Sequence, residues 1–472
     1  MDILEMDACA QSEALAAGTL SAVELMQPTL ARIAAVNGTV NAIVSLRDSD
    51  ALMAEARAAD AAPRRGWLHG IPFAVKDLAN VAGLPTSMGS PVFAGQVAAA
   101  DDLVVARIRQ AGAIFIGKTN TPEFGMGSHT FNPVHGATRN PYDPTKSAGG
   151  SSGGTAAGLA SRMLSVADGS DMMGSLRNPA GWNNVYGMRP TWGTVPSEPV
   201  GDMFMHQLAT SGPMARCPRD LAALLDTMTG ADPRQPHGIS PADTVPHLDA
   251  ALPRQRVGWL GDWGGALPFE DGIMAISESA ITQMQGQGHS VSRMAAPFDA
   301  DLMWESWTTL RSFTVAAGLG DIHADPERRA LLKEAVQWEV ERGLAQQAMT
   351  LHRASVIRSD WYRRVLTLFD EVDVLVLPSA QMWPFDVDWV HPTQIAGVAM
   401  DTYHRWMQVT VPAGLIGLPV VNLPIGFGAN GLPAGLQIIG PRGSDAKLLQ
   451  FAQAWHQETD WPGQKPPKLP AA

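Results

Sequence analysis

Lys76, Ser151 and Ser175 are the residues of this sequence whose types and surroundings suit nucleophilic chemistry. Ser151 lies in the stretch Gly-Gly-Ser-Ser-Gly-Gly at 149–154, and Ser175 lies in Asp-Met-Met-Gly-Ser-Leu-Arg at 171–177. A serine hydroxyl is a weak nucleophile and needs a base. Two serines in glycine-rich turns, with a lysine upstream, therefore suggest a serine hydrolase that uses lysine in place of histidine.

Lys76 has the surroundings that such a base requires. It ends the apolar run Ile-Pro-Phe-Ala-Val at 71–75, which predicts a buried strand. Burial disfavours the charged form of a lysine and lowers its pKa, so a neutral amine becomes available near neutral pH. On a strand, Asp77 points to the opposite face from Lys76 and need not keep the lysine charged.

Each motif has a second interpretation when it is taken alone. The segment 149–154 would also suit a flexible loop, and it matches the G-x-S-x-G nucleophile elbow with Ser151 as the nucleophile. The elbow needs a strand directly before it, whereas 140–144 predicts a turn. Lys118 is a second candidate base, but it lies in the turn after a predicted strand, where a structural role is expected.

The elements that would position these residues alternate between helix and strand. Helices are predicted from a capping box at Ser21 to a break at Asn37-Gly38, and over about 48–61, 102–111 and 155–163. Strands are predicted at 42–44, 71–75, 113–116, 164–167, 255–260 and 372–377. Long helices dominate 295–405, and seven of the 14 tryptophans lie between Trp304 and Trp406. This alternation favours an α/β architecture.

Composition excludes several classes of partner. The net charge is −12 and Lys and Arg form no run, so nucleic acid and membrane surfaces are not expected partners. Cys9 and Cys217 are too few for a disulfide framework or a Cys-rich zinc site. The first residues do not suit a signal peptide, and no apolar run is long enough to span a membrane. We expect a cytoplasmic protein without a metal or cofactor.

Further motifs occur in an order that resembles the amidase signature family. They are Gly-Lys-Thr-Asn at 117–120, the glycine–serine stretch at 149–177, Gly-Met-Arg-Pro-Thr at 187–191, Gly-Pro-Met-Ala-Arg at 212–216 and Gly-Leu-Pro-Ala-Gly-Leu-Gln-Ile-Ile-Gly at 431–440. The resemblance covers nearly the whole chain. It implies one α/β domain over residues 1–472, with a large, mixed and mostly parallel sheet covered by helices on both faces. It also implies that the 295–405 segment is variable and roofs the substrate channel.

The resemblance implies a role for each candidate residue. Ser175 would be the nucleophile, Ser151 the bridging serine held by a cis peptide, and Lys76 the base. A hydroxyl both donates and accepts a proton, so Ser151 can pass a proton from Ser175 to Lys76 and return one to the leaving amine. Ser152, Asp171 and Arg177 would support this site, with Arg177 as an anchor for the turn.

The oxyanion hole is expected in the turn before the nucleophile. In the family its donors are the backbone N–H groups that correspond here to Met172, Met173, Gly174 and Ser175. The family usually has Asp-x-Gly-Gly-Ser, and this chain has Met173 at the first glycine. We therefore expect Met173 either to narrow the acyl pocket or to shift a donor.

These features predict an amidohydrolase that cleaves carbon–nitrogen bonds of linear amides. The apolar, tryptophan-rich 295–405 segment favours an apolar or aryl amide or anilide, with carbamates (urethanes) and esters as related substrates. One alternative is the glutaminase subunit of a tRNA-dependent amidotransferase, and another is a non-catalytic binding protein with an amidase fold. The only partner expected is a small amide-type molecule, and the chain is expected to be a monomer or homodimer.

Overall fold

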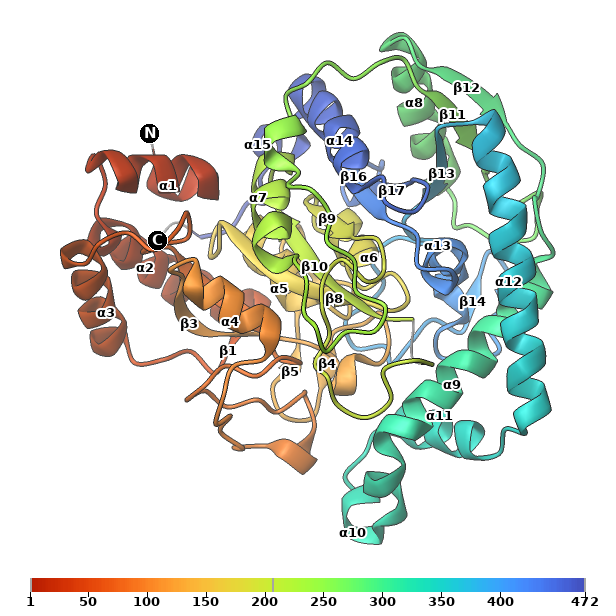
Figure 1. Cartoon of the computed structure of the whole chain (residues 1–472), viewed down its shortest axis with the longest axis horizontal. Helices are drawn as coiled ribbons and strands as arrows, with labels where there is room; N and C mark the ends of the chain where they lie inside the picture. The colour runs from red at the N-terminus through yellow and green to blue at the C-terminus, as the bar shows by residue number, and fades with distance from the viewer. Residues whose placement is uncertain (1, 206–207, 471–472) are drawn as a thin grey trace.

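The computed structural model describes residues 2–205 and 208–470 of the chain. An eight-stranded sheet runs from the centre to the upper right of Figure 1, in the order β12-β11-β13-β17-β16-β9-β10-β8. Its strands are β8 (Val166–Asp171), β9 (Tyr186–Arg189), β10 (Thr210–Ala215), β11 (Arg256–Trp259), β12 (Ser290–Arg293), β13 (Val374–Pro378), β16 (Val420–Phe427) and β17 (Pro433–Ile439). Every residue of β9, β13 and β17 is buried, so both faces of the sheet are covered.

Strand direction differs from the sequence prediction. Of the described pairings in this sheet, β11–β12 and β11–β13 are parallel and the others are antiparallel. Helix α6 (Arg177–Trp182) joins β8 to β9, but β10 lies between these two strands and runs antiparallel to both. In the same way β17 separates β13 from β16. The predicted α/β class and mixed sheet are confirmed, whereas the parallel majority is wrong because these two strands are inserted.

Two groups of helices cover the faces of the sheet. In the first group, α5 (Gly153–Ala160) contacts β8 and β10, and α6 contacts β9, β16 and β17. In the second group, α7 (Pro218–Met228) contacts β8, β9 and β10, while α8 (Ile273–Gly286) and α14 (Asp445–Thr459) contact β16. Together the two groups of helices cover the buried strands of the sheet.

A second, three-stranded sheet carries Lys76. Its order is β1 (Ile43–Val44), β3 (Ile114–Thr119) and β2 (Pro72–Lys76), and β2 packs alongside β8 of the larger sheet. The helices of this part, at the left of Figure 1, are α1 (Ala8–Ala17), α2 (Ala22–Val40), α3 (Ser49–Ala61) and α4 (Leu103–Gln110). The capping box at Ser21 begins α2 as predicted, but the helix continues through Asn37-Gly38 and ends where Asn41 adopts a left-handed conformation (φ 52°).

The 295–405 segment forms a layer of long helices at the right and bottom of Figure 1. These are α9 (Ala300–Ala324), α10 (Pro326–Arg329), α11 (Glu334–Leu344) and α12 (Ala348–Glu371). α9 packs against both α11 and α12. The remaining short elements are β4 (Phe131–Asn132), β5 (Gly136–Ala137), β6 (Arg139–Asn140), β7 (Asp143–Ser147), β14 (Gln394–Ile395), β15 (Val398–Ala399), α13 (Val411–Leu415) and α15 (Trp461–Gln464), with 3-10 turns at Ile3–Glu5, Pro91–Phe93, Glu123–Gly125, Val245–His247 and Arg405–Thr410.

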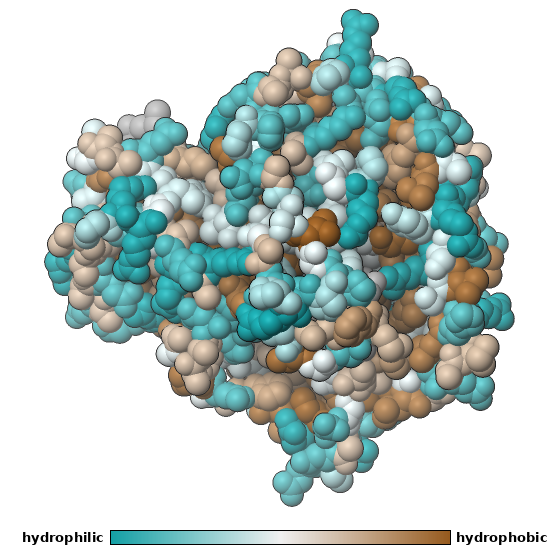
Figure 2. Space-filling view, viewed as in Figure 1, coloured by the Kyte–Doolittle hydropathy of each residue, from teal (hydrophilic) through white to brown (hydrophobic). Residues whose placement is uncertain are grey.

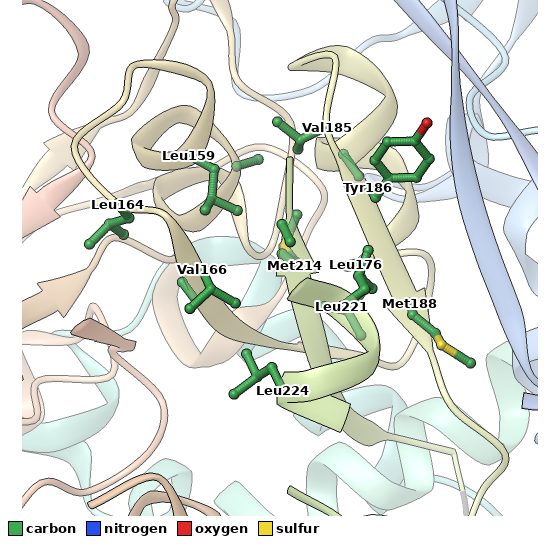
Figure 3. Close-up of a cluster of buried hydrophobic side chains, with 14 of the residues drawn as sticks. Leu159, Leu164, Val166, Leu176, Val185, Tyr186, Met188, Met214, Leu221 and Leu224 are labelled. Atoms are coloured by element: carbon green, nitrogen blue, oxygen red, sulfur yellow. The ribbon is translucent and has the colours of Figure 1, made fainter. Parts of the chain in front are cut away.

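The apolar core fixes the position of β8 and of the turn that follows it. Figure 3 shows side chains from α5, β8, β9, β10 and α7 meeting around these strands, among them Leu159, Val166 and Leu221. Leu176, the residue after Ser175, is fully buried in the same cluster. Because close-packed interiors resist displacement, this packing holds the Ser175 turn in one place.

Exposed apolar side chains are concentrated in the 295–405 segment. Ten of the fifteen large apolar side chains that are exposed among the described residues belong to it. Figure 2, which has the same view as Figure 1, shows apolar residues in the lower half of the molecule, where α9 and α11 lie in Figure 1. Within the described ranges, no helix is both long and apolar enough to cross a membrane.

Candidate active site

Lys76 lies at the end of β2, and its side chain is buried among hydroxyl groups. Its Nζ lies 2.7 Å from Ser151 Oγ, 2.9 Å from Ser152 Oγ and 3.1 Å from Ser170 Oγ. Only 1% of the lysine is exposed. Burial lowers the pKa of Lys76 to about 7, although the carboxylates of Asp168 and Asp171 oppose this shift. A substantial neutral fraction is therefore available near neutral pH.

Ser151 lies two residues before α5, and its hydroxyl contacts the lysine amine. The Gly150–Ser151 peptide bond is cis, as the family resemblance implied. Ser152 is the N-cap of α5, and its hydroxyl donates to the carbonyl of Ser170. The hydroxyl groups of Ser151 and Ser152, which are adjacent in the chain, thus both contact the amine of Lys76.

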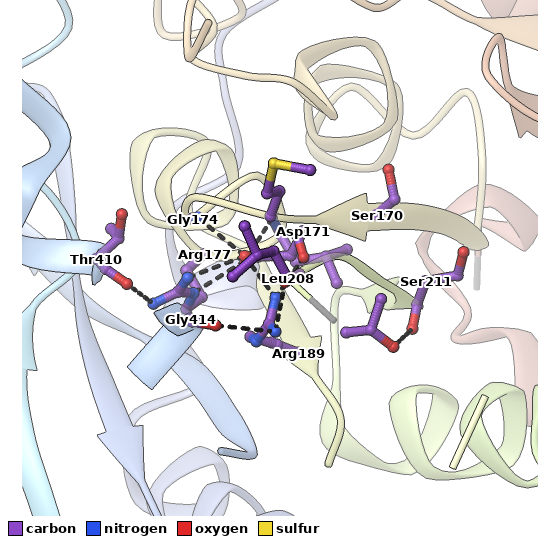
Figure 4. Close-up of polar contacts among 12 residues, drawn as sticks. Ser170, Asp171, Gly174, Arg177, Arg189, Leu208, Ser211, Thr410 and Gly414 are labelled. Carbon is purple, nitrogen blue, oxygen red and sulfur yellow. Dashed lines mark hydrogen bonds and ion pairs between the residues drawn. The ribbon is translucent and has the colours of Figure 1, made fainter. Parts of the chain in front are cut away.

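Ser175 lies in the turn between β8 and α6, and Asp171 organises this turn. Figure 4 shows the Asp171 side chain between the guanidinium groups of Arg177 and Arg189. Asp171 also accepts the backbone N–H of Gly174 (2.9 Å) and of Leu176 (3.1 Å). Burial alone would raise the pKa of Asp171, but the charges of both arginines hold it well below its usual range. This carboxylate is therefore ionised and fixes the turn on both sides of Ser175.

Arg177 anchors the same turn to two distant segments of the chain. It binds Asp171 through Nε and Nη2, and its Nη1 donates to the carbonyl of Thr410 and to Gln437 Oε1. Gly174 has φ +83°, and an added Cβ would lie 2.6 Å from Thr410 Cγ2, so only glycine fits there. The sequence predicted the anchoring role of Arg177 but not that of Arg189 from β9.

The turn presents three free backbone donors near Ser175. Gly174 N–H is occupied by Asp171, whereas the N–H groups of Met172, Met173 and Ser175 have no acceptor among the described residues. Met173 adopts an ordinary backbone conformation, so replacing the family's glycine has not required a left-handed residue at that position. Three of the four predicted oxyanion donors are thus available to an incoming oxygen.

Ser151 and Ser175 line one cavity of about 340 Å³. Its walls come from the loop after β2, the turn at Glu123–Gly125, the Ser175 turn and one face of α9. The remaining lining residues are Leu78, Met88, Phe124, Gly125, Met126, Ser170, Met172, Ala209, Arg311, Thr314, Val315, Gly318 and Leu319. Arg311 is the one charged side chain of this set, and it is held by Tyr403 Oη (2.7 Å) and Glu339 (3.6 Å). A cavity of this size and mainly apolar lining suits a small organic molecule.

Two sequence expectations about this cavity are wrong. Met173 does not line it; the side chain is 5% exposed and packs in a hydrophobic cluster with Trp182 and Trp406. Met172 occupies the wall instead, with its Sδ 3.2 Å from Arg311 Nη1. The tryptophans of the 295–405 segment also do not line it, because those on α9, Trp304 and Trp307, face the core.

Other candidate residues lie away from the two serines. Lys118 pairs with Asp77 (3.4 Å) and donates to Thr86 Oγ1 and to the Ala79 carbonyl, which is the structural role expected for it. Cys217 is buried near the start of α7, where its thiol and carboxylate oxygens of Asp7 and Asp220 lie within 4.8 Å of one another. Sequence spacing did not predict this group because its members come from the start of α1 and from α7.

Sequence reasoning also missed Asp168 and Ser170 of β8. Asp168 accepts the backbone N–H of Lys76 at 3.0 Å, and Ser170 contacts the lysine amine. The signal was present, because a buried strand seldom holds an aspartate in its interior unless that residue has a partner.

Comparisons with known proteins agree with this geometry. The amidase family model matches residues 24–449. The chain is 34% identical to a glutamyl-tRNA(Gln) amidotransferase subunit from Ralstonia nicotianae, over 96% of this chain and 98% of that one. It is 31% identical to the acylamidase of Rhodococcus erythropolis, over 98% and 97%. A crystal structure of a bacterial aryl acylamidase superposes with a TM-score of 0.91 at 25% identity, over 98% and 99%.

The chain therefore belongs to the amidase signature family. It is a hydrolase that acts on carbon–nitrogen bonds, as the sequence predicted.

Proposed function

We propose that this protein hydrolyses small apolar or aryl amides through an acyl-enzyme on Ser175, with Ser151 and Lys76 as the proton relay. The observation that carries the proposal is the 2.7 Å contact between Lys76 Nζ and Ser151 Oγ, at the wall of the cavity that Ser175 also lines. A lysine whose pKa is about 7 can accept a proton at neutral pH.

Acylation begins when Ser175 Oγ attacks the amide carbon. The proton of Ser175 passes to Ser151 Oγ while the proton of Ser151 passes to Lys76 Nζ. The N–H groups of Met172, Met173 and Ser175 donate hydrogen bonds to the amide oxygen as negative charge develops on it. On collapse, the proton returns through Ser151 to the leaving nitrogen, which departs as an amine.

Deacylation uses the same groups with water in place of Ser175. Water donates a proton through Ser151 to Lys76 and attacks the ester carbonyl. The second tetrahedral intermediate collapses when the proton returns to Ser175 Oγ. The products are a carboxylic acid and the free serine, and no step requires a metal or cofactor.

The cavity wall supports an apolar substrate. Leu78, Met88, Met126, Val315 and Leu319 surround the space in front of the serines. Two of the relatives point the same way, because one is an acylamidase and one is an aryl acylamidase. Anilides and aryl amides are therefore the preferred class, with carbamates (urethanes) and esters as further substrates of the same acyl-transfer chemistry.

The glutaminase subunit of a tRNA-dependent amidotransferase is the second candidate. Its support is the 34% identity to an amidotransferase subunit over nearly the full length of both chains. Free glutamine is strongly polar, whereas Arg311 is the one charged side chain at the cavity and is already paired with Glu339. The apolar lining therefore favours the amidase over the glutaminase.

A panel of substrates tests the two candidates. Hydrolysis of anilides, primary amides, aryl carbamates, aryl esters and free glutamine is measured with the wild type and with Ser175→Ala as the blank. The proposal requires kcat/KM for an apolar anilide or aryl amide to exceed that for glutamine by at least about 100-fold, since burying each apolar group adds binding energy. Better cleavage of glutamine than of any anilide would reverse the assignment.

A further inference from the structure

Asp168 is a buried carboxylate beside Lys76 that the relay described above leaves without a role. It lies in the middle of β8 and is 5% exposed. Its Oδ1 accepts the backbone N–H of Lys76 at 3.0 Å. This bond joins β2 to β8 through a side chain at the point where the two sheets meet. The carboxylate thereby fixes the position of Lys76 relative to the strand that leads into the Ser175 turn.

Lys76 and Asp168 share a second cavity of about 250 Å³ that neither Ser151 nor Ser175 lines. Leu78, Ser170 and Ala209 line both this cavity and the one that contains the serines, so they separate the two. Ser170 and its cross-strand partner Ser211 project to the same side, as Figure 4 shows. The wall also includes Asp102, Glu198, Thr210 and Ser211. The polar side chains of this wall distinguish the second cavity from the mainly apolar cavity that contains the serines.

The other charged groups near the pair are already matched. Asp171 is held by Arg177 and Arg189. Lys118, from β3, pairs with Asp77. In the cavity wall, Asp102 accepts two hydrogen bonds from Asn80, and Glu198 accepts the N–H of Leu103. Asp168 is the carboxylate whose charge acts most strongly on Lys76, ahead of Asp171.

Burial brings the pKa values of Asp168 and Lys76 closer together. Burial raises the pKa of Asp168 to about 6, although the backbone N–H and charge of Lys76 oppose the shift. Burial lowers the pKa of Lys76 to about 7, and Asp168 is the largest opposing influence. Each group therefore influences the proton affinity of the other through its charge.

We propose that Asp168 is a positioning residue that holds Lys76 in place and stabilises the ammonium ion formed when the lysine accepts the relay proton. This inference rests on the proposed function. Before attack, the neutral amine and the carboxylate carry a charge of −1 together. When the proton of Ser175 moves to Ser151 and that of Ser151 moves to Lys76, the pair becomes neutral. The buried site thus exchanges a single negative charge for two opposite charges that attract each other, and returning the proton to the leaving nitrogen restores the first state.

Asp168→Asn tests this role because asparagine keeps the shape and the acceptor for the Lys76 N–H but removes the charge. Without the nearby anion the lysine loses its proton more readily, so the acid limb of the kcat/KM profile should move to lower pH by about one unit. The weaker base should lower the plateau rate by up to about tenfold. The rate of inactivation by a fluorophosphonate, measured over the same pH range, should show the same displacement.

Asp445→Asn is the matched control. Asp445 is also buried and accepts a backbone N–H, that of Thr191, at 2.8 Å, but it lines neither cavity. This variant should leave the midpoint of the acid limb unchanged. If Asp168→Asn does not fold, as judged by circular dichroism and thermal unfolding, Asp168→Ser keeps an oxygen near the Lys76 N–H and must show the same downward displacement.

An unchanged midpoint, or a move to higher pH, in a folded Asp168 variant would overturn the inference and leave Asp168 a purely structural residue. Failure of the proposed function would look different. In that case Lys76→Ala would retain the wild-type rate and its acid limb, whatever the Asp168 variants do.

Discussion

At the scale of single residues, Lys76 sets the pH at which the relay operates. Its pKa is lowered to about 7, mainly by burial, and only the neutral amine can accept a proton. Activity should therefore be low well below pH 7, rise through pH 7 and level off above it. Measuring kcat/KM from about pH 5 to 9 checks this profile. Lys76→Ala should lower kcat by about 10²–10⁴-fold at pH 8, as expected for loss of a general base. A rate that falls as pH rises through 7 would exclude the lysine as base.

Met172 and Met173 are neighbours in the chain, but replacing them should have different effects. Substitution of Met172 should change substrate preference, and substitution of Met173 should change stability. Met172 lines the cavity, so Met172→Ala should enlarge it and raise kcat/KM more for long acyl chains than for acetyl substrates. Met173 is buried in the core, so Met173→Ala should lower the free energy of unfolding by about 2–5 kcal/mol and leave chain-length preference unchanged. Acyl-length series and urea unfolding of both variants measure these effects. If Met173→Ala instead changes the preference, the placement of these two side chains is wrong.

The order of motifs was enough to predict that Ser151 contacts Lys76 and that Ser151 and Ser175 line the same cavity. Residues 149–154 and 171–177 are close in sequence, and the structure brings Ser151 onto the amine of Lys76. The cavity wall was not predictable in the same way. Arg311, Val315 and Leu319 lie on α9, more than 130 residues from Ser175, and only tertiary packing decides which face of that helix meets the site. The abundance of tryptophan in this part of the chain suggested an apolar roof for the channel, whereas Trp304 and Trp307 of α9 are buried in the core.

At the scale of elements, α9 forms a wall of the cavity that a single substitution can alter without a steric clash. Gly318 lines the cavity, and an added Cβ there meets no atom within 4 Å. Gly318→Leu should therefore narrow the cavity and lower kcat/KM for bulky substrates at least about tenfold, while stabilising the helix by up to about 1 kcal/mol. Steady-state kinetics with small and bulky anilides measure this.

Gly320 provides the control on the same helix. Its Cβ position is equally open, but the residue does not line the cavity. Gly320→Leu should give the same helix stabilisation without changing substrate preference. Equal kinetic effects of the two variants would show that α9 does not form the substrate wall.

Element boundaries were predictable where local signals act alone. The capping box at Ser21 marks the start of α2 as predicted. Asn37-Gly38 was expected to end this helix, yet Asn37 Oδ1 accepts the N–H groups of Ala42 and Ile43, so its side chain ties the helix to β1 while its backbone stays helical. Strand direction depends on the insertion of β10 between β8 and β9 and of β17 between β13 and β16. These pairings join distant parts of the chain and cannot be predicted from local sequence patterns.

At the scale of the whole molecule, the relay should work without a metal ion. Asp7, Cys217 and Asp220 come close together, but none of them lines the cavity that contains the serines or the second cavity that Lys76 lines. Asp220 accepts the N–H groups of Ala8 and Cys9, which accounts for both of its oxygens. Prolonged treatment with a strong chelator should leave kcat/KM unchanged. A loss of activity that added zinc or manganese restores would contradict the metal-free mechanism.

The site of the covalent intermediate tests the central claim most directly. The wild type, Ser175→Ala and Ser151→Ala are treated with a fluorophosphonate at about pH 8, and intact mass and peptide mapping locate the adduct. The account predicts one adduct on Ser175 in the wild type and none in Ser175→Ala. Ser151→Ala should still be labelled on Ser175, but at least about 100-fold more slowly, because the route from Ser175 to Lys76 is broken. An adduct on Ser151, or full labelling of Ser175→Ala, would contradict the assignment of Ser175 as the nucleophile.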